Sequence, residues 1–203
     1  MTSAAASIGK RIEAMPAGEA FTAGDFLDVA SQSSANTTLH RLEREGKVER
    51  AVRGVYAKPR RSGLLGISAP PSADAVARAI ARSNRWVIAP AGDTALNMLG
   101  LDDQVPASAE YVSSGPYKTY AYGNTEIRFR HRANRDLVEC SPTTMLVTQA
   151  LRALGRDGVD DEVLRRVSSR FSDDDVRALY EETRNSTAWV FQFAKRLKEE
   201  RGL

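Results

Sequence analysis

Polar and basic side chains between positions 34 and 58 are of the types that hydrogen-bond to DNA bases and neutralise phosphates. In the major groove asparagine pairs with adenine, arginine pairs with guanine, and threonine contacts the thymine methyl group. These pairings assign adenine to Asn36, guanine to Arg41, and a thymine methyl or a phosphate to Thr37. The candidate DNA-binding residues are Ser34, Asn36, Thr37, His40, Arg41, Arg44, Lys47, Arg50, Arg53 and Lys58.

The basic charge of the chain is concentrated in the same region. The 203 residues carry a net charge of +3, and residues 1–61 hold ten Lys or Arg against seven Asp or Glu, so the rest of the chain is neutral. Residues 40–61 alone hold eight basic residues against three acidic ones. A local basic excess favours a polyanion because neutralised phosphates release counterions. A solvated charged face is the alternative that composition leaves open.

The elements that would position these side chains can be predicted from the spacing of apolar residues. Ile8, Ile12 and Met15 recur at helical spacing, and Thr22 with Asp25 would cap a second helix that runs to residue 30. After a polar break at 31–33, Ser33 or Ser34 would cap a third helix, which ends near residue 45 because Gly46 supplies a left-handed residue.

The third predicted helix has an apolar and a polar face. Ala35, Leu39 and Leu42 fall on one side, so the polar candidates point away from the core. Residues 48–52 and 55–58 then alternate as two strands that turn at Arg53-Gly54, with Arg50 and Arg53 placed to contact phosphates or the minor groove. Three helices followed by a basic hairpin predict a winged helix-turn-helix over residues 1–58.

The remainder of the chain predicts a second domain. Residues 59–73 are rich in Pro, Gly and Ser and are interpreted as a linker. Helices are expected at 75–81, 93–99, from 143, at 160–169, after Ser172 and from about 186, and strands at 86–88, 111–113, 117–122 and 125–130. The fold class is therefore α+β: an N-terminal winged helix-turn-helix followed by a mixed α/β domain over 74–203 with a helical C-terminal tail.

Other classes of protein find little support in the sequence. No apolar stretch is long enough to span a membrane, and residues 1–7 lack the features of a secretory signal, so a cytoplasmic location is expected. Cys140 has no second cysteine to pair with, and no cofactor or metal site is predicted. The order of His, Arg and Asp in residues 131–136 departs from a kinase catalytic loop, and Asp173–Asp175 is interpreted as the start of a helix. No enzyme activity is predicted.

Two blocks of sequence resemble a known family. The first block resembles the winged-helix start of AbiEi-type antitoxins of type IV toxin–antitoxin systems, and the second resembles the segment that follows it in that family. The blocks are Thr38-Leu39-His40-Arg41-Leu42 with Gly46, Val48 and Arg53-Gly54-Val55-Tyr56, and Pro90-Ala91-Gly92-Asp93-Thr94-Ala95-Leu96-Asn97 with Leu99-Gly100-Leu101, Gln104-Val105-Pro106 and Tyr111. The resemblance covers roughly residues 8–132.

This resemblance implies an antitoxin that represses its own operon by binding inverted repeats in double-stranded DNA. Its second domain would counteract a co-encoded nucleotidyltransferase toxin, directly or functionally, and two copies of the protein would meet on the DNA. Leu96, Leu99 and Val105 are expected in the core of that domain. Possible secondary contacts to phosphate or a partner are Tyr117, Lys118, Tyr120, Arg128 and Arg130, although a solvated strand face explains them equally well.

Two alternative functions remain open. One is a winged-helix transcriptional regulator whose second domain senses a ligand or dimerises. The other is an enzyme that modifies the toxin. A nucleotidyltransferase gene beside this one would favour the antitoxin, whereas a solitary gene would favour the regulator.

Overall fold

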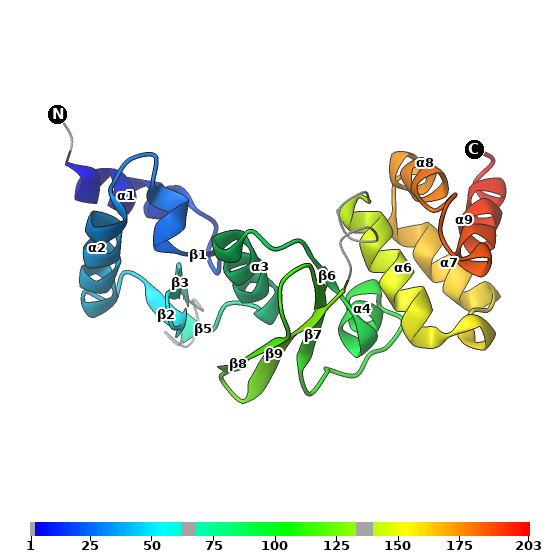
Figure 1. Cartoon of the computed structure of the whole chain (residues 1–203), viewed down its shortest axis with the longest axis horizontal. Coiled ribbons are helices and arrows are strands. Elements are labelled where there is room, and N and C mark those ends of the chain that lie inside the picture. The colour runs from blue at the N-terminus through cyan, green and yellow to red at the C-terminus, as the bar shows by residue number, and fades with distance from the viewer. Residues whose placement is uncertain (1–2, 62–67, 133–139) are drawn as a thin grey trace. The chain divides into compact units, whose positions relative to one another are not determined.

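The computed structural model describes residues 3–61, 68–132 and 140–203 as a mixed α+β protein (Figure 1). The chain divides into two compact units. The first holds Met1–Trp86 together with Tyr120–Asn124, and the second holds Val87–Thr119 and Thr125–Leu203. The predicted fold class is confirmed at this level, with helices and strands in both units and a helical C-terminal region.

The first unit begins with three helical segments and a small sheet. These are α1 (Ala4–Ala14), β1 (Ala20–Phe21), the 3-10 helix η1 (Ala23–Phe26), α2 (Gln32–Arg44), β2 (Glu49–Val52) and β3 (Val55–Ala57). The strands form an antiparallel sheet in the order β1-β3-β2. One hydrophobic core joins these elements, and its fully buried side chains include Ile8, Phe21, Phe26 and Leu39.

The start of η1 follows the predicted capping interaction. The Asp25 carboxylate accepts hydrogen bonds from the backbone N–H of Thr22 at 2.8 Å and from its hydroxyl at 3.2 Å. The predicted helix to residue 30 is wrong in length, because the regular segment ends at Phe26. A single short turn of 3-10 helix therefore occupies the place of the second helix.

Helix α2 begins earlier than the sequence suggested. Its N-cap is Ser31, whose side chain accepts a hydrogen bond from the Ser34 backbone N–H at 3.2 Å. The prediction of a polar break over 31–33 with a cap at Ser33 or Ser34 is therefore wrong, because an earlier serine offers the same cap. The end of the helix is confirmed: Gly46 has a φ of 67°, and the Lys47 N–H closes on the Leu42 carbonyl oxygen at 2.9 Å.

The segment predicted as a linker contains regular structure. Strands β4 (Arg60–Arg61) and β5 (Ser68–Ala69) pair with each other, while residues 62–67 lie outside the described residues. Helix α3 (Ala73–Asn84) then packs against β1 and β3 of the first unit, with the Arg82 guanidinium 2.8 Å from the Ala20 carbonyl oxygen. The structure therefore divides the chain after Trp86 instead of at 59–73. Prolines and glycines that suggested a linker are equally compatible with a hairpin.

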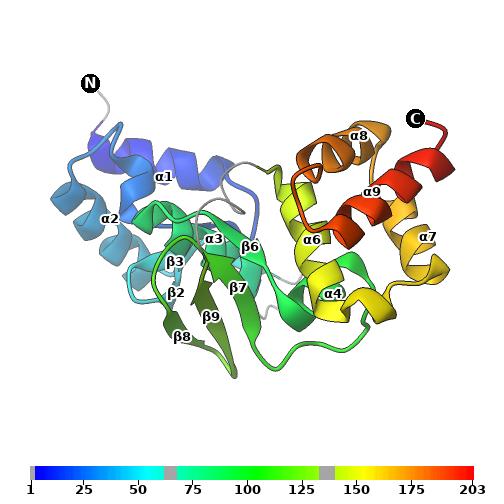
Figure 2. The same cartoon turned by 45° about the vertical axis from the view of Figure 1, so that its right-hand side comes forward.

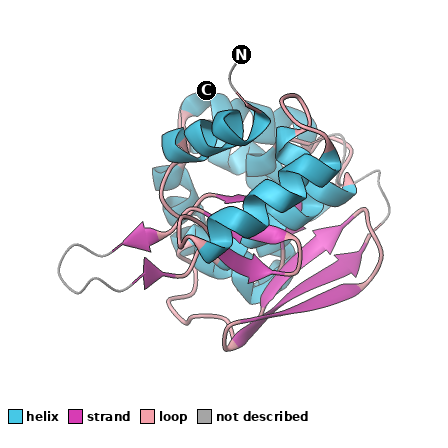
Figure 3. Ribbon diagram, turned by 90° about the vertical axis from the view of Figure 1, so that its left-hand side faces the viewer, coloured by secondary structure: helices cyan, strands magenta, loops and turns pink. Residues whose placement is uncertain are grey.

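A four-stranded sheet follows, in the order β6-β7-β9-β8 (Figure 3). Its strands are β6 (Ile88–Pro90), β7 (Ala109–Ser113), β8 (Lys118–Tyr122) and β9 (Thr125–His131). The strand predicted at 86–88 begins two residues later than expected. Strands β7 and β9 run parallel, with Tyr111 opposite Phe129. This pairing separates β7 from β8, the next strand in the chain.

The regular elements from Pro142 onward are all helices, as predicted, and α4 (Gly92–Leu99) joins them in one helical layer of the second unit. The helices from Pro142 onward are α6 (Pro142–Leu154), the 3-10 helix η2 (Arg156–Gly158), α7 (Asp161–Arg170), α8 (Asp173–Glu182) and α9 (Ala188–Glu200) (Figure 2). All five α-helices contribute side chains to one core. None of the helices in the described ranges has the length and apolar composition that crossing a bilayer requires.

Three expectations about single residues of the second unit can be compared with this core. Leu96 and Leu99 are buried as predicted. Val105 is 88% exposed, so its prediction as a core residue is wrong. It lies in the loop after α4, where the Asn97 amide donates to the Asp102 and Gln104 carbonyl oxygens at 3.3 and 3.0 Å. These bonds fix the loop backbone without burying the valine.

The acidic run at 173–175 has local partners, which agrees with its interpretation as the start of a helix. Asp175 accepts from the hydroxyl of Ser172 at 2.6 Å, and hydrogen bonds from Ser172 lower the pKa of the carboxyl below its ordinary value. Asp174 pairs with Arg177 at 2.9 Å, and Asp173 pairs with Arg201. These interactions cap and brace α8.

Candidate nucleic-acid interface

Helix α2 has one apolar and one polar face along its whole length. Ala35, Thr38, Leu39 and Leu42 are buried. The exposed residues are all polar or charged, namely Gln32, Ser33, Asn36, Thr37, His40, Arg41 and Arg44. Ser34 is half-buried, and its backbone N–H is bonded to the cap. The structure thus brings five of the six residues predicted on this helix to one exposed face.

Asn36, Thr37 and Arg44 carry different hydrogen-bonding groups on this face. The Thr37 hydroxyl donates to the Ser33 carbonyl oxygen at 3.0 Å, so its proton is used within the helix. Within the described ranges, neither the Asn36 amide nor the Arg44 guanidinium has a side-chain hydrogen bond or ion pair. Both groups are free to bond to another molecule.

His40 joins the helix to the sheet. Its Nδ1 atom lies 3.4 Å from the Tyr56 hydroxyl and 3.4 Å from a Glu43 carboxylate oxygen, and the two rings meet edge to face. Tyr56 is 3% exposed, and burial raises the pKa of its hydroxyl. His40 therefore helps to fix α2 against β3, besides lying on the exposed face.

Two of the predicted cations are held by one acidic residue. The Glu45 carboxylate lies 2.8 Å from Lys47 Nζ and 3.6 Å from Arg41 Nε. The hydrogen bond from Lys47 lowers the pKa of Glu45 below its ordinary value, so this carboxylate is ionised throughout the neutral range. Arg41 and Lys47 thus share a negative charge at the C-terminal end of α2.

The β2–β3 hairpin carries two arginines without such a partner. Gly54, with a φ of 82°, makes the turn after Arg53, and the register of the strands shifts between Arg50 and Val52. Both arginines are exposed, while Val55 of β3 is buried. In the part of the chain that the structure describes, no ion pair involves Arg50 or Arg53. The hairpin therefore carries two exposed arginines that form no ion pair within the described ranges, together with Glu49 of β2.

Lys58, predicted as a DNA contact, forms hydrogen bonds within the protein. Its ammonium group donates to the carbonyl oxygens of Glu13 and Met15 at 2.5 and 2.6 Å. These carbonyls lie at the C-terminal end of α1, where a helix leaves acceptors without partners. The Lys58 ammonium therefore caps the C-terminal end of α1 and stabilises the fold.

The five predicted secondary contacts lie on β8, on β9 and just before β8. Arg128 pairs with Glu126 at 2.7 Å, and Arg130 pairs with Glu110 at 2.9 Å, so glutamates balance both arginines. Tyr117 is 74% exposed beside the His131 ring. Lys118 belongs with these residues to the second unit, whereas Tyr120 belongs to the first.

Three residues of the candidate interface were not among those predicted from the sequence. Gln32 and Ser33 belong to the exposed face because α2 begins at Gln32. Ser31, which has a good N-cap side chain, was the signal that could have found them. Glu45 was counted only as a negative charge, although its position four residues after Arg41 permits a helical ion pair.

We expect Lys58→Met to lower the free energy of unfolding by about 1 to 2 kcal/mol, because the end of α1 loses a charged donor. Urea unfolding followed by circular dichroism measures this change. The control is Arg53→Met, which removes an exposed cation with no intramolecular partner and should change the value by less than about 0.5 kcal/mol. Equal stability of the two variants would contradict the structural assignment of Lys58.

Comparison with known proteins yields a sequence family and similarity to solved structures. A profile described as "Family of unknown function (DUF6088)" matches residues 7–179. No curated protein is similar in sequence to the chain. The crystal structure of the RV2827C protein from Mycobacterium tuberculosis is similar with a TM-score of 0.43 and 14% sequence identity, over 98% of this chain and 77% of that one. Because the family match runs through both compact units, the chain belongs to the DUF6088 family.

Proposed function

We propose that the first unit is a winged helix-turn-helix domain that binds double-stranded DNA in a sequence-specific manner. Helix α2 would enter the major groove, and the β2–β3 hairpin would be the wing. The observation that carries this proposal is the wholly polar exposed face of α2, next in the chain to a hairpin with two unpaired arginines. The element order α1, β1, η1, α2, β2, β3 also supports it.

The dimensions and charge of this surface suit a DNA duplex. An α-helix fits the width of the major groove, and the 13 residues of α2 provide about 20 Å of helix, enough to cross it. Arg44, Arg50 and Arg53 are not neutralised by acidic neighbours in the described ranges, so their full charge is available to phosphates. A protein-binding winged helix would not need these cations on this face.

The environments of these side chains suggest which of them would contact bases and which would contact phosphates. Asn36 is the strongest candidate for adenine, because its amide is free and short. Arg44 is preferred to Arg41 for guanine, because Arg41 would have to release Glu45 first. Arg50 and Arg53 would bind phosphates or the adjacent minor groove.

We further propose that the protein represses its own operon and acts as the antitoxin of a type IV toxin–antitoxin system. The resemblance of residues 38–56 and 90–111 to AbiEi-type antitoxins supports this role. An inverted repeat would bring two copies onto the DNA. The second unit would then counteract the co-encoded nucleotidyltransferase toxin.

Gel-shift titration on the protein's own promoter and on scrambled DNA tests the DNA-binding proposal. Asn36→Ala and Arg44→Ala should each weaken promoter binding by about 1 to 3 kcal/mol and relax the preference at particular bases. Arg50→Ala and Arg53→Ala should weaken both DNAs alike and reduce the salt slope by about one each. Equal binding of the wild type to both DNAs would exclude sequence-specific recognition.

Glu45→Gln should strengthen DNA binding, because it removes a negative charge and releases Arg41 and Lys47 from their shared carboxylate. We expect a severalfold gain in affinity together with a steeper salt dependence, because exposed charges act on phosphates through screened interactions. Glu19→Gln is the matched control, since it makes the same charge change before β1. An unchanged affinity for Glu45→Gln would show that this end of α2 stays away from phosphate.

Growth rescue in cells that express the adjacent gene product tests the antitoxin proposal. With the full chain expressed from an unrelated promoter, the double variant Arg50→Ala/Arg53→Ala should still rescue growth while it fails to repress a reporter under the native promoter. This result would separate the two activities. Failure of the wild-type protein to rescue growth would contradict the antitoxin role and leave the DNA-binding proposal intact.

A further inference from the structure

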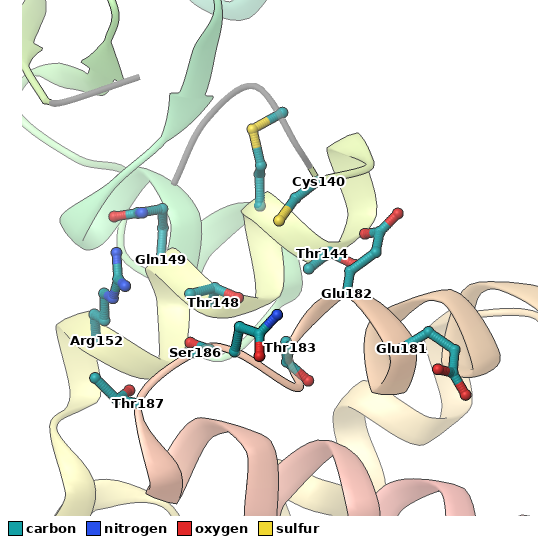
Figure 4. A pocket seen from close by; sticks show the side chains of 12 residues that line it. Cys140, Thr144, Thr148, Gln149, Arg152, Glu181, Glu182, Thr183, Ser186 and Thr187 are labelled. Carbon is teal, nitrogen blue, oxygen red and sulfur yellow. The ribbon is translucent and has the colours of Figure 1, made fainter. Parts of the chain in front are cut away.

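The second unit contains a polar pocket of about 540 Å³ between α6 and the segment that joins α8 to α9 (Figure 4). This volume lies within the range of small-molecule sites. Twelve residues line the pocket, and two of them are Cys140 and Met145. The other ten have polar or charged side chains: Thr144, Thr148, Gln149, Arg152, Glu181, Glu182, Thr183, Asn185, Ser186 and Thr187.

The regular spacing of α6 builds one wall of the pocket. Thr144, Thr148 and Arg152 are four residues apart, so they follow one face of the helix over more than two turns. Gln149 lies beside them on the next row. Figure 4 shows Thr148, Gln149 and Arg152 projecting from α6 and Ser186 and Thr187 on the opposite wall.

Both acidic side chains of the lining already have partners. Glu182 accepts hydrogen bonds from the backbone N–H and the hydroxyl of Ser141 at 2.8 and 2.9 Å, and so supports the cap of α6. Glu181 pairs with Arg184 at 3.1 Å. The hydroxyl of buried Thr183 donates to the Leu179 carbonyl oxygen at 2.7 Å. These groups maintain the walls.

The other end of the pocket has donors that the fold leaves uncommitted. Among the described residues, no side-chain hydrogen bond or ion pair involves the following six lining residues: Thr148, Gln149, Arg152, Asn185, Ser186 and Thr187. They converge on one cavity from two elements. Arg152 is the only cation of the lining, and it lies at the end of the pocket away from Glu182, whose negative charge lies beside Ser141 (Figure 4).

We propose that this pocket binds a small molecule that carries an anionic oxyacid group, either a phosphate or a carboxylate. A guanidinium offers planar paired donors that match both anions, which places Arg152 as the ion-pairing group. Gln149 and Ser186 lie within the same lining and supply neutral donors. The site is independent of the proposed DNA contacts, which belong to the first unit.

Titration of the full-length protein with inorganic phosphate and, separately, with succinate tests this proposal. Binding is measured by isothermal calorimetry and by NMR chemical-shift changes at the backbone amides of residues 148–152 and 185–187. Binding of phosphate alone would support a phosphorylated ligand, binding of succinate alone a carboxylated one, and binding of both the shared anionic class. If neither phosphate nor succinate binds at tens of millimolar, the proposal is overturned.

Variants locate the site. Arg152→Gln should weaken binding at least about tenfold, as expected for the loss of a charged hydrogen bond, and Ser186→Ala should weaken it less. Arg177→Gln is the matched control, because it removes an exposed arginine on α8 that does not line the pocket. Thermal unfolding verifies that each variant is folded. Unchanged binding by Arg152→Gln and Ser186→Ala would overturn the assignment to this pocket.

Discussion

The apolar side of α2 is the constraint on which the candidate interface depends. Leu39 is fully buried among the side chains of α1, η1 and the small sheet, so the rotation of α2 about its axis is fixed. With that rotation fixed, Asn36, Thr37 and Arg44 must face outward, because a helix cannot bury one side without exposing the other. Ser31 and Gly46 set the two ends of the same helix. Core packing and capping thus determine which polar groups are available for recognition.

Counting charges overstates how many cations this surface offers. Composition gave Lys58, Arg41 and Arg53 equal weight, but the structure assigns them different environments: Lys58 bonds to the end of α1, and Arg41 shares Glu45 with Lys47. Only cations whose charge is uncompensated contribute their full value to counterion release. In the proposed complex, Arg50 and Arg53 of the hairpin would therefore contribute more to phosphate binding than Arg41, Lys47 and Lys58.

Several short-range patterns were predicted correctly from the sequence, although the N-cap of α2 and the length of η1 were not, and the long-range contacts were not predicted. The Thr22–Asp25 cap, the buried stripe of α2 and the C-terminal helices depend on residues within one or two helical turns, so periodicity and capping rules predict them. The parallel pairing of β7 with β9 joins segments separated by another strand, and α3 packs on β1, which lies about fifty residues earlier, as well as on β3. No local pattern encodes such contacts, so the boundary between the units was misplaced.

The pocket of the second unit also depends on long-range contacts, so it could not be predicted from the sequence. In the sequence, Thr148, Gln149 and Arg152 fall within a helix expected from residue 143, and Ser186 marks the expected start of the last helix. Their chemistry arises only because the helical core brings the α8–α9 segment opposite α6. Since a row of polar side chains is solvated when it stands alone, the second wall is what turns it into a site where a ligand can replace water.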